Sequence, residues 1–250
     1  MKAFVISLSL MKSSITPARE VLAQLTAYGF DAELFEGTYG DDAVLLFEKD
    51  GRRIADLGIK TSVILAGDFT ELHPEIHLPR EVASLNIRMD PRNDKTFEKM
   101  MRPGVIGCFY SHYRLWEHCI ALDEPIFIFE DDVIFERGYH PVEWDDVLLL
   151  CTCKDHDFYR PLLYSPSGEP RAIPLPRTYM PGSAGYGITP KGARKLVSAY
   201  SKEFLPADNA MNVFTVKLQC HTHLMGRAAT AEEGNVSLTK TYKRIRSRDL

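Results

Sequence analysis

The feature that most constrains this chain is a short apolar run that ends in three consecutive carboxylates. Residues 125–135 read P-I-F-I-F-E-D-D-V-I-F, so four large apolar side chains at 126–129 stand directly before Glu130, Asp131 and Asp132. An apolar run of this length, bounded by a proline and a charge cluster, predicts a strand buried on both faces. Because such strands belong to sheets covered by helices on both sides, we expect an α/β fold.

The three carboxylates have two interpretations. Acidic triplets are common in solvated surface turns, because charged side chains are seldom buried without a partner. At the carboxyl end of a central strand, however, they would lie where open α/β sheets bind ligands. Clustered carboxylate oxygens suit Mg²⁺ or Mn²⁺, and such an ion binds phosphate oxygens. The buried strand before them and the apolar residues 133–135 after them give the two interpretations equal weight.

Length and composition narrow the class of protein. At 250 residues, with 45% apolar and 26% charged side chains, the chain has the balance of a single globular domain. A net charge of −4 argues against a nucleic-acid partner. The apolar N-terminus is interrupted by Ser7 and Ser9 and is followed by Lys12 with no cleavage site, so we expect a first buried strand and a cytoplasmic location.

The cysteines do not predict a disulfide framework, because there are five of them in a chain of this length. Cys151 and Cys153 with His156 are arranged like part of a zinc site, but no second ligand pair follows at a suitable spacing. Cys108 and Cys119 fall in a helical pattern, where we expect small buried apolar residues.

Helices and strands are predicted in alternation. Thr16 as N-cap and Pro17 at the first helical position begin a helix that Gly29 ends. This helix joins strands at 3–10 and 32–35, the order of a parallel β-α-β crossover. The remaining pattern predicts helices at 41–49, 103–122, 190–200 and 209–216, a buried strand at 144–151 and a long loop at 153–179, and leaves 51–100 unassigned.

Several polar residues are candidates for contact with a nucleotide. The loop after the first strand lies at the carboxyl edge of the sheet, so Ser7, Thr16 and Arg19 could contact a base or ribose, although a single arginine is more often a solvated surface residue. Ser111 and His112 lie within the helix at 103–122, where they form either a hydrogen-bonded core pair or part of a ligand cleft.

The C-terminal residues 240–248 are basic in an otherwise acidic chain. They are either a frayed, solvated tail or a segment drawn weakly to an anionic membrane surface, at ~1 kcal/mol per well-placed basic residue. The second interpretation predicts a peripheral position on the inner face of the inner membrane.

Four stretches, taken in order, resemble glycosyltransferase family 25, whose members extend bacterial lipooligosaccharide and lipopolysaccharide cores and include collagen galactosyltransferases. They are the N-terminal strand and helix with Arg19, G-V-I-G-C-F-Y-S-H-Y-R-L-W at 104–116, the apolar strand with E-D-D-V, and S-A-G-Y-G-I-T-P-K-G-A at 183–193.

The resemblance implies a GT-A-like fold with a Rossmann-type central mixed sheet flanked by helices. It implies a single domain, with a nucleotide-binding half at 1–135, an acceptor-binding half at 136–238 and a basic tail at 239–250. The implied reaction moves a hexose, galactose first, from a UDP-sugar to a lipid-linked lipooligosaccharide or lipopolysaccharide acceptor, with inversion. The donor would be bound by Ser7, Thr16, Arg19, Ser111, His112, Glu130, Asp131 and Tyr186, and Mn²⁺ or Mg²⁺ by Asp132 with Glu130 or Asp131.

Inversion by direct displacement needs a base that takes the proton of the acceptor hydroxyl. Asp208, after Pro206 at a predicted helix start, is the first candidate, although it would serve equally as an N-cap. Asp155 and Asp157 in the long loop are the alternatives. Tyr186 and Lys191 are expected to shape the sugar pocket, and the three glycines of residues 179–188 to let a ligand approach the backbone.

Two other functions remain open. A metal-dependent phosphohydrolase or phosphotransferase also places acids after a buried strand, but needs a second acidic pair downstream, for which only Asp145-Asp146 and Glu232-Glu233 are available. A non-catalytic module that binds a sugar nucleotide would have the same site without turnover.

Overall fold

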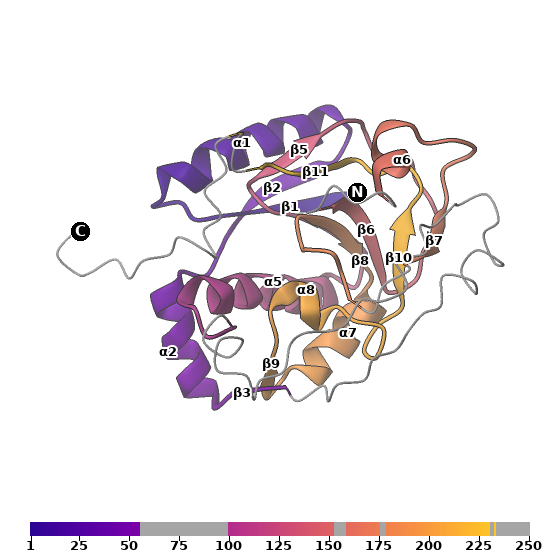
Figure 1. Cartoon of the computed structure of the whole chain (residues 1–250). Coiled ribbons are helices and arrows are strands. Elements are labelled where there is room, and N and C mark those ends of the chain that lie inside the picture. The colour runs from indigo at the N-terminus through magenta and orange to yellow at the C-terminus, as the bar shows by residue number, and fades with distance from the viewer. Residues whose placement is uncertain (56–99, 153–158, 176–178, 231–232, 234–250) are drawn as a thin grey trace.

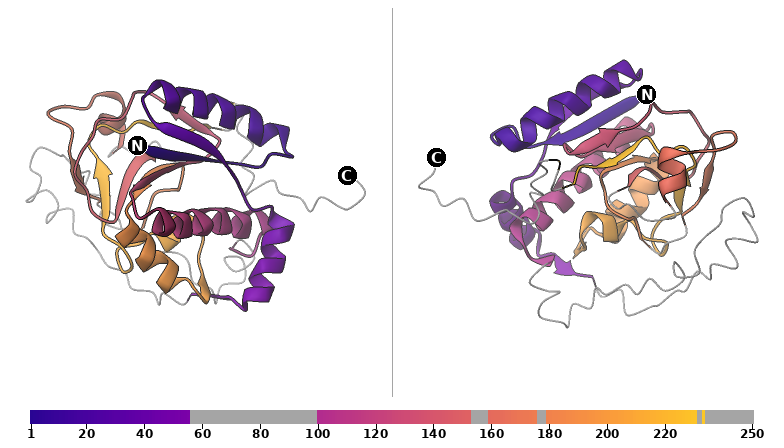
Figure 2. Two further views of the ribbon diagram at one scale, coloured as in Figure 1. Left: turned by 180° about the vertical axis from the view of Figure 1, so that it is seen from behind. Right: turned by 45° about the horizontal axis from the view of Figure 1, so that its top comes forward.

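The molecule is a central sheet with helices on both faces (Figure 1). α1 (Lys12–Ala27) covers one face, and α5 (Pro103–Leu122) and α7 (Pro190–Ala199) pack together against the other. Seen from behind, α2 (Gly40–Asp50) lies against α5 (Figure 2). The predicted α/β fold, with a GT-A-like central mixed sheet flanked by helices, is confirmed. The computed structural model describes residues 1–55, 100–152, 159–175, 179–230 and 233.

The main sheet is mixed because it has two antiparallel strands in an otherwise parallel set. Its strands in spatial order are β2 (Asp31–Glu36), β1 (Lys2–Ser7), β4 (Ile126–Phe129), β8 (Gly185–Ile188), β6 (Val147–Thr152), β10 (Leu218–His221) and β7 (Ala172–Pro174). β8 runs antiparallel to both β4 and β6, while β1 pairs in parallel with β2 and β4. The carboxyl ends of β1, β4, β6 and β10 therefore lie along one edge.

The remaining elements extend this core. β11 (Gly226–Ala228) pairs with β5 (Val133–Phe135) and with the end of β6, and β3 (Arg53–Ile54) pairs with β9 (Glu203–Phe204) as a separate ribbon. Two short helices complete the described part, α6 (Tyr159–Tyr164) and α8 (Ala207–Ala210). Among the described helices, none combines the length and hydropathy needed to span a bilayer.

β4 is buried on both faces, as its apolar run predicts. Ile126 and Ile128 belong to the core beneath α5, while Phe127 and Phe129 belong to the core beneath α1. All four side chains are at most 4% exposed. The alternation follows from the period of two in a strand, so β4, like β6, contributes side chains to both cores of the molecule.

α1 begins earlier than predicted, and this corrects the assignment of Thr16 and Pro17. β1 ends at Ser7, and a turn closed by the Met11 N–H on the Leu8 carbonyl (2.9 Å) leads into the helix. Ser14 N donates to the Met11 carbonyl at 2.9 Å, so the first helical bond forms before Thr16 is reached. Thr16 and Pro17 therefore lie inside the helix.

Three other predictions are wrong in their extent. The described part of the predicted loop at 153–179 contains α6 and β7, and the strand expected at 144–151 begins only at Val147. The helix expected at 209–216 ends at Ala210, because the Asn212 side-chain amide donates to the carbonyls of Asn209 (2.9 Å) and Ala210 (3.1 Å) and so replaces the next helical donors.

The glycines of β8 serve internal packing rather than ligand approach. A β-carbon on Gly185 would lie 2.7 Å from the Cys151 sulfur and 2.8 Å from the Phe129 ring, and one on Gly187 would lie 2.9 Å from Trp144. Cys119 is buried as predicted, whereas Cys108 is half-buried. Cys151 is buried in β6 beside Gly185, and Cys153 and His156 lie outside the described residues.

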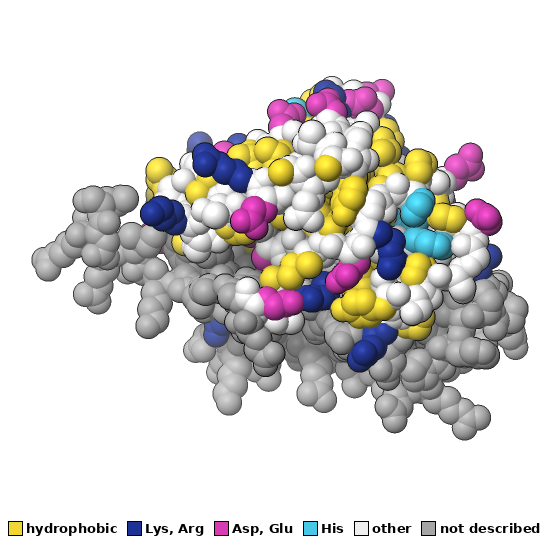
Figure 3. Space-filling view, turned by 90° about the horizontal axis from the view of Figure 1, so that it is seen from above, with side chains coloured by type: hydrophobic (Ala, Val, Ile, Leu, Met, Phe, Trp, Pro, Cys, Tyr) yellow, Lys and Arg dark blue, Asp and Glu magenta, His cyan; other side chains and the backbone are white. Residues whose placement is uncertain are grey.

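Seen from above, the face over α1 carries acidic, basic and apolar side chains intermixed (Figure 3). Charges of both signs therefore lie on this face, in keeping with the small net charge of the chain. The basic residues at 240–248, and the whole predicted tail at 239–250, lie outside the described residues.

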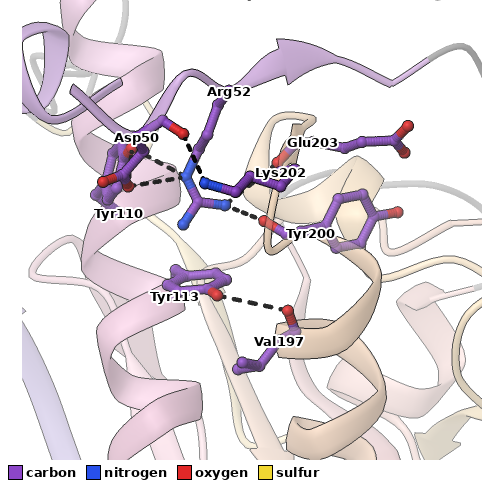
Figure 4. A network of polar contacts seen from close by, with 8 residues as sticks. All are labelled: Asp50, Arg52, Tyr110, Tyr113, Val197, Tyr200, Lys202 and Glu203. Atoms are coloured by element: carbon purple, nitrogen blue, oxygen red, sulfur yellow. Dashed lines mark hydrogen bonds and ion pairs between the residues drawn. The ribbon is translucent and has the colours of Figure 1, made fainter. Parts of the chain in front are cut away.

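Arg52 ties together the helices on the α5 face (Figure 4). Its guanidinium contacts Asp50 (Nε to Oδ2, 3.2 Å), the Tyr110 hydroxyl (3.0 Å) and the Tyr200 carbonyl, and it lies 4.4 Å from the centre of the Tyr113 ring. Because Asp50 ends α2, the two tyrosines at 110 and 113 lie on α5 and Tyr200 follows α7, one buried cation joins three helices.

We predict that Arg52→Met destabilises the fold by about 2–4 kcal/mol, because the buried partners of the guanidinium lose their donor. Arg53→Met is the matched control, since the Arg53 side chain is 79% exposed and, within the described residues, forms an ion pair only with Glu203. Its loss should cost at most about 1 kcal/mol. Urea unfolding of both variants measures the difference, and equal losses would contradict the role of Arg52.

Candidate functional site

The candidate site lies where the strand order of the sheet reverses. From β1 the chain passes through α1 to β2 on one side, while β4 flanks β1 on the other. Ligands of open α/β sheets bind in the crevice outside the carboxyl ends of such a strand pair. Val5 pairs with Phe129, so Ser7 at the end of β1 lies beside the three carboxylates that follow β4. We refer to this region as the carboxylate edge, defined by Ser7, Ser14, Glu130, Asp131 and Asp132.

The first two acids of the triplet face different elements. Glu130 Oε1 accepts from Ser183 Oγ and lies 3.3 Å from His112 Nε2, so it points toward α5 and the segment before β8. Asp131 Oδ2 accepts from Ser14 Oγ in the first turn of α1. Side chains of neighbouring residues at the end of a strand point to opposite faces, which explains the divergence. The triplet is therefore not one convergent cluster.

The environments of these two acids move their pKa values in opposite directions. Burial raises the pKa of Glu130, but the hydrogen bonds from His112 and Ser183 outweigh it and hold the pKa below its ordinary value. Burial also raises the pKa of Asp131, and with the charge of Glu130 it prevails over the hydrogen bond from Ser14, which leaves the pKa at about 6. Glu130 is thus the carboxylate that these surroundings keep ionised.

Asp132 lies in the turn before β5. Its backbone carbonyl accepts from Ala229 N at 2.7 Å, which fixes the turn against β11, and its Oδ1 is buried. Of the predicted metal ligands, Asp131 is engaged with Ser14, whereas Glu130 and Asp132 follow β4 at the carboxyl edge of the sheet with no bond to Ser14. Carboxylates of this kind fit a hard divalent cation.

The described residues also contain one mixed group of metal-capable atoms. Cys108 Sγ, a His112 ring nitrogen and a Glu130 oxygen all lie within 4.8 Å of one another. Both ring nitrogens of His112 already have partners, however, since Nδ1 lies 2.9 Å from the Tyr186 hydroxyl and Nε2 lies beside Glu130. This group is soft where the carboxylates are hard, so it favours a different class of ion.

Ser111 belongs to the core. Its hydroxyl donates to the Gly107 carbonyl (2.8 Å) and accepts from Thr38 N (2.8 Å), which secures the β2–α2 connection to α5. Both of these hydrogen bonds join the Ser111 hydroxyl to backbone atoms, so the geometry does not support the predicted contact of Ser111 with the sugar-nucleotide donor. His112 and Tyr186 are fully buried and contact each other rather than facing outward.

The other predicted donor residues lie near the crevice to different degrees. Ser7 is buried at the end of β1, and its carbonyl accepts from Gly37 N at 2.8 Å. Thr16 and Arg19 are exposed on α1, four and seven residues past its first residue, which is ~6 and ~10 Å along the axis. Within the described residues, neither side chain has a hydrogen bond or ion pair with the three carboxylates, so the roles of Thr16 and Arg19 stay predictions.

Asp208 lies in the first turn of α8, whose N-cap is Pro206, so the N-cap alternative is wrong. Its Oδ1 accepts from Asn209 N at 3.0 Å. Met180 N donates to the Met211 carbonyl just after α8, and the chain continues from there to Ser183, which contacts Glu130. Three residues span at most ~11 Å. Because α8 packs against α5, whose His112 contacts Glu130, α8 and Glu130 lie on the same side of the sheet. Asp155 and Asp157 lie outside the described residues.

Lys191 lies at the opposite edge of the sheet, and this corrects its expected place at the sugar pocket. Its ammonium lies 3.9 Å from Asp146 Oδ1, and Lys195 pairs with the same carboxylate. Asp146 stands just before β6, whereas Glu130 follows β4, which runs in the same direction. The Asp145-Asp146 pair is therefore remote from Glu130.

Sequence reasoning missed two hydroxyls and one indole of the site. None of the predicted site residues is Ser14, Ser183 or Trp116, yet these three contact Asp131, Glu130 and Tyr186 respectively. A weak signal existed in the position of Ser14 directly after the first strand, where side chains reach the carboxyl edge.

Comparison with known proteins gives a family match. Residues 1–211, which include every described residue of the carboxylate edge, match the family described as Glycosyltransferase family 25 (LPS biosynthesis protein). Similar proteins include "Probable inactive glycosyltransferase 25 family member 3" of Rattus norvegicus, 29% identical over 167 residues, and "Procollagen galactosyltransferase 2" of Homo sapiens, 31% identical over 147 residues. These alignments cover 63% and 53% of this chain but 28% and 23% of the relatives, so the chain spans about a quarter of their length.

We predict that Asp131 makes the metal-free fold less stable as the pH rises from 4 to 6. The Asp131 carboxyl releases its proton near the ordinary pKa of 3.8 in the unfolded chain but only near 6 in the folded chain, so stability is lost across that window. Asp131→Asn should therefore gain on the order of 1–2 kcal/mol relative to the natural chain between pH 4 and pH 7, allowing for partial exposure.

Urea unfolding at both pH values measures this change. Asp145→Asn is the control, because the hydrogen bond from Lys217 lowers the pKa of Asp145; its contribution to stability is then lost only below about pH 4, and the difference between pH 4 and pH 7 should change little. A difference between Asp131→Asn and the natural chain that does not vary with pH would show that Asp131 titrates normally.

Proposed function

The chain belongs to glycosyltransferase family 25, and we propose that it transfers a hexose from a UDP-sugar to an oligosaccharide acceptor with inversion at the anomeric carbon. The single observation that carries the proposal is the carboxylate edge at the β1/β4 reversal, where an ionised Glu130 and Asp132 stand in a nucleotide-binding position of the fold. The family match supports the reaction class, and the position of the carboxylate edge in the sheet supports the proposed place of the site.

Glu130 and Asp132 are the residues that would hold Mn²⁺ or Mg²⁺. When bound, such an ion neutralises the charge that develops on the diphosphate leaving group. Asp131 would act as a structural residue, since its hydrogen bond from Ser14 anchors the acidic turn to α1. Ser7, Thr16 and Arg19 remain the proposed contacts to the nucleoside.

Asp208 is the proposed base. An inverting displacement needs the acceptor hydroxyl on the face of the sugar away from the diphosphate, so its proton must pass to a group set apart from the metal ligands. α8 is on the same side of the sheet as Glu130 but separated from it by the segment 180–183. Asp155 and Asp157 stay as alternatives.

The identities of the donor sugar and of the acceptor are also part of the proposal. Galactose is favoured because one relative is named a procollagen galactosyltransferase, and a lipopolysaccharide or lipooligosaccharide core is favoured by the family description. A lipid-linked acceptor would suit a cytoplasmic protein held loosely at the inner face of the inner membrane by the basic residues 240–248.

A non-catalytic module that binds a sugar nucleotide is the second candidate function. It is favoured by a specific observation, since relatives such as the rat and human family members 3 are named inactive. A phosphohydrolase is less well supported, because Asp146 lies at the opposite edge and both Glu233 oxygens bind Arg227. Glu232 lies outside the described residues.

A thermal-shift screen separates these functions. UDP, UDP-galactose and UDP-glucose are tested with and without Mn²⁺, because a ligand that binds only the folded state raises Tm by mass action. A shift that requires Mn²⁺, with release of UDP on addition of an acceptor, is the expected result. A shift without turnover would favour the binding module, and no shift with any UDP species would remove the donor assignment.

We predict that Asp132→Asn lowers turnover at least ~100-fold while Tm stays close to that of the natural chain, because the change removes a charged ligand and keeps the size of the side chain. Asp145→Asn at the opposite edge is the matched control and should keep full activity. Turnover assays and melting curves on both variants check this, and an active Asp132→Asn enzyme would remove Asp132 from the metal site.

A further inference from the structure

A line of buried hydrogen-bonding side chains leads from α5 to Glu130. Trp116 Nε1 lies 2.9 Å from the Tyr186 hydroxyl, which lies 2.9 Å from His112 Nδ1, and His112 Nε2 lies 3.3 Å from Glu130 Oε1. Trp116, Tyr186 and His112 are each fully buried. We call these three residues the buried chain.

The direction of the hydrogen bonds follows from the chemistry of each group. An indole N–H can only donate, so the Tyr186 oxygen accepts from Trp116. Burial raises the pKa of Tyr186 well above its ordinary value, so the phenol keeps a proton to donate. The neighbouring atom that can accept that proton is His112 Nδ1. When Nδ1 accepts, the single ring hydrogen of a neutral imidazole is on Nε2. Nε2–H then donates to Glu130.

This order leaves the two oxygens of Glu130 in different states. Oε1 accepts hydrogen bonds from both His112 Nε2–H and the hydroxyl of Ser183. Within the described residues, no hydrogen bond to Oε2 is found. Two donors on one oxygen fix the rotation of the carboxylate. The side chain of Glu130 is 26% exposed although its partner His112 is fully buried, so the group bridges the core and the crevice.

We propose that the buried chain of Trp116, Tyr186 and His112 is a positioning device that fixes His112 as the Nε2–H tautomer and thereby turns Glu130 Oε2 toward the ligand. His112 and Tyr186 are then positioning residues rather than contacts of the donor sugar. The proposal deepens the proposed function, since it rests on Glu130 as a ligand of the metal–diphosphate.

The tautomer is measurable without any activity. Long-range ¹H–¹⁵N NMR spectra of histidine rings distinguish Nε2–H, Nδ1–H and imidazolium forms, and the signal of His112 among the eight histidines is identified by its absence in a His112→Gln sample. The expected result in the metal-free full chain is the Nε2–H tautomer. An Nδ1–H form would leave Nε2 as a lone pair beside Cys108 and Glu130, and an imidazolium would donate from both nitrogens; either overturns the proposal.

Two isosteric variants separate positioning from packing. The amide nitrogen of Gln reaches the place of Nε2 and can donate to Glu130, whereas that of Asn reaches only the place of Nδ1. His112→Gln should keep Mn²⁺ affinity within about threefold of the natural chain, and His112→Asn should lose ~10–100-fold, the usual effect of removing a partner that orients a metal ligand. Tyr186→Phe, which keeps the ring, should weaken Mn²⁺ binding in the same direction.

Calorimetric titration of Mn²⁺ in the presence of UDP measures these affinities, and melting curves show whether each variant is folded. Equal losses in the Gln and Asn variants would mean that His112 acts only through packing and would overturn the proposal. If the natural chain shows the Nε2–H tautomer but neither Mn²⁺ binding nor transfer, the proposed function fails while the orientation of the chain stands. If Mn²⁺ binds and His112 is not Nε2–H, only the positioning device fails.

Discussion

The burial of β4 on both faces is the constraint on which the rest of the structure depends. Ile126 and Ile128 need a helical layer on one side, and Phe127 and Phe129 need another on the opposite side, so α5 and α1 must both pack on this strand. The chain can accept charge again only at the end of the strand. The acidic turn is therefore placed at the carboxyl edge by the same burial that holds the fold together.

Neighbouring acids at this edge have different chemistry because they face different layers. Glu130 points toward the α5 layer, where His112 and Ser183 supply donors, and its pKa is lowered. Asp131 points toward α1, where the Ser14 hydroxyl donates a hydrogen bond to it, and burial with the charge of Glu130 raises its pKa to about 6. Of these two acids, Glu130 is kept ionised by its donors and Asp131 is held to α1 by Ser14, which explains how adjacent carboxylates are tolerated at this edge.

The position of α5 matters for this arrangement, since α5 carries His112, one of the two donors to Glu130. Arg52 supplies rigidity at one end by joining α2, α5 and the end of α7 through a buried cation (Figure 4). Ser111 secures α5 to the β2–α2 connection. The family includes members that are named inactive, so membership of the family alone does not decide activity.

The local pattern of the sequence was sufficient to predict the buried strand, the acidic turn and the helix at 103–122, because burial and period act over a few residues. Only the tertiary structure decided that β8 enters antiparallel between β4 and β6, and that Glu130 meets Ser183 while Asp131 meets Ser14, 117 residues away. Ser111 looked like its neighbour His112 in the sequence, yet one bonds the backbone and the other the site. Hydrogen-bond partners distant along the chain are chosen by packing, on which local periodicity carries no information.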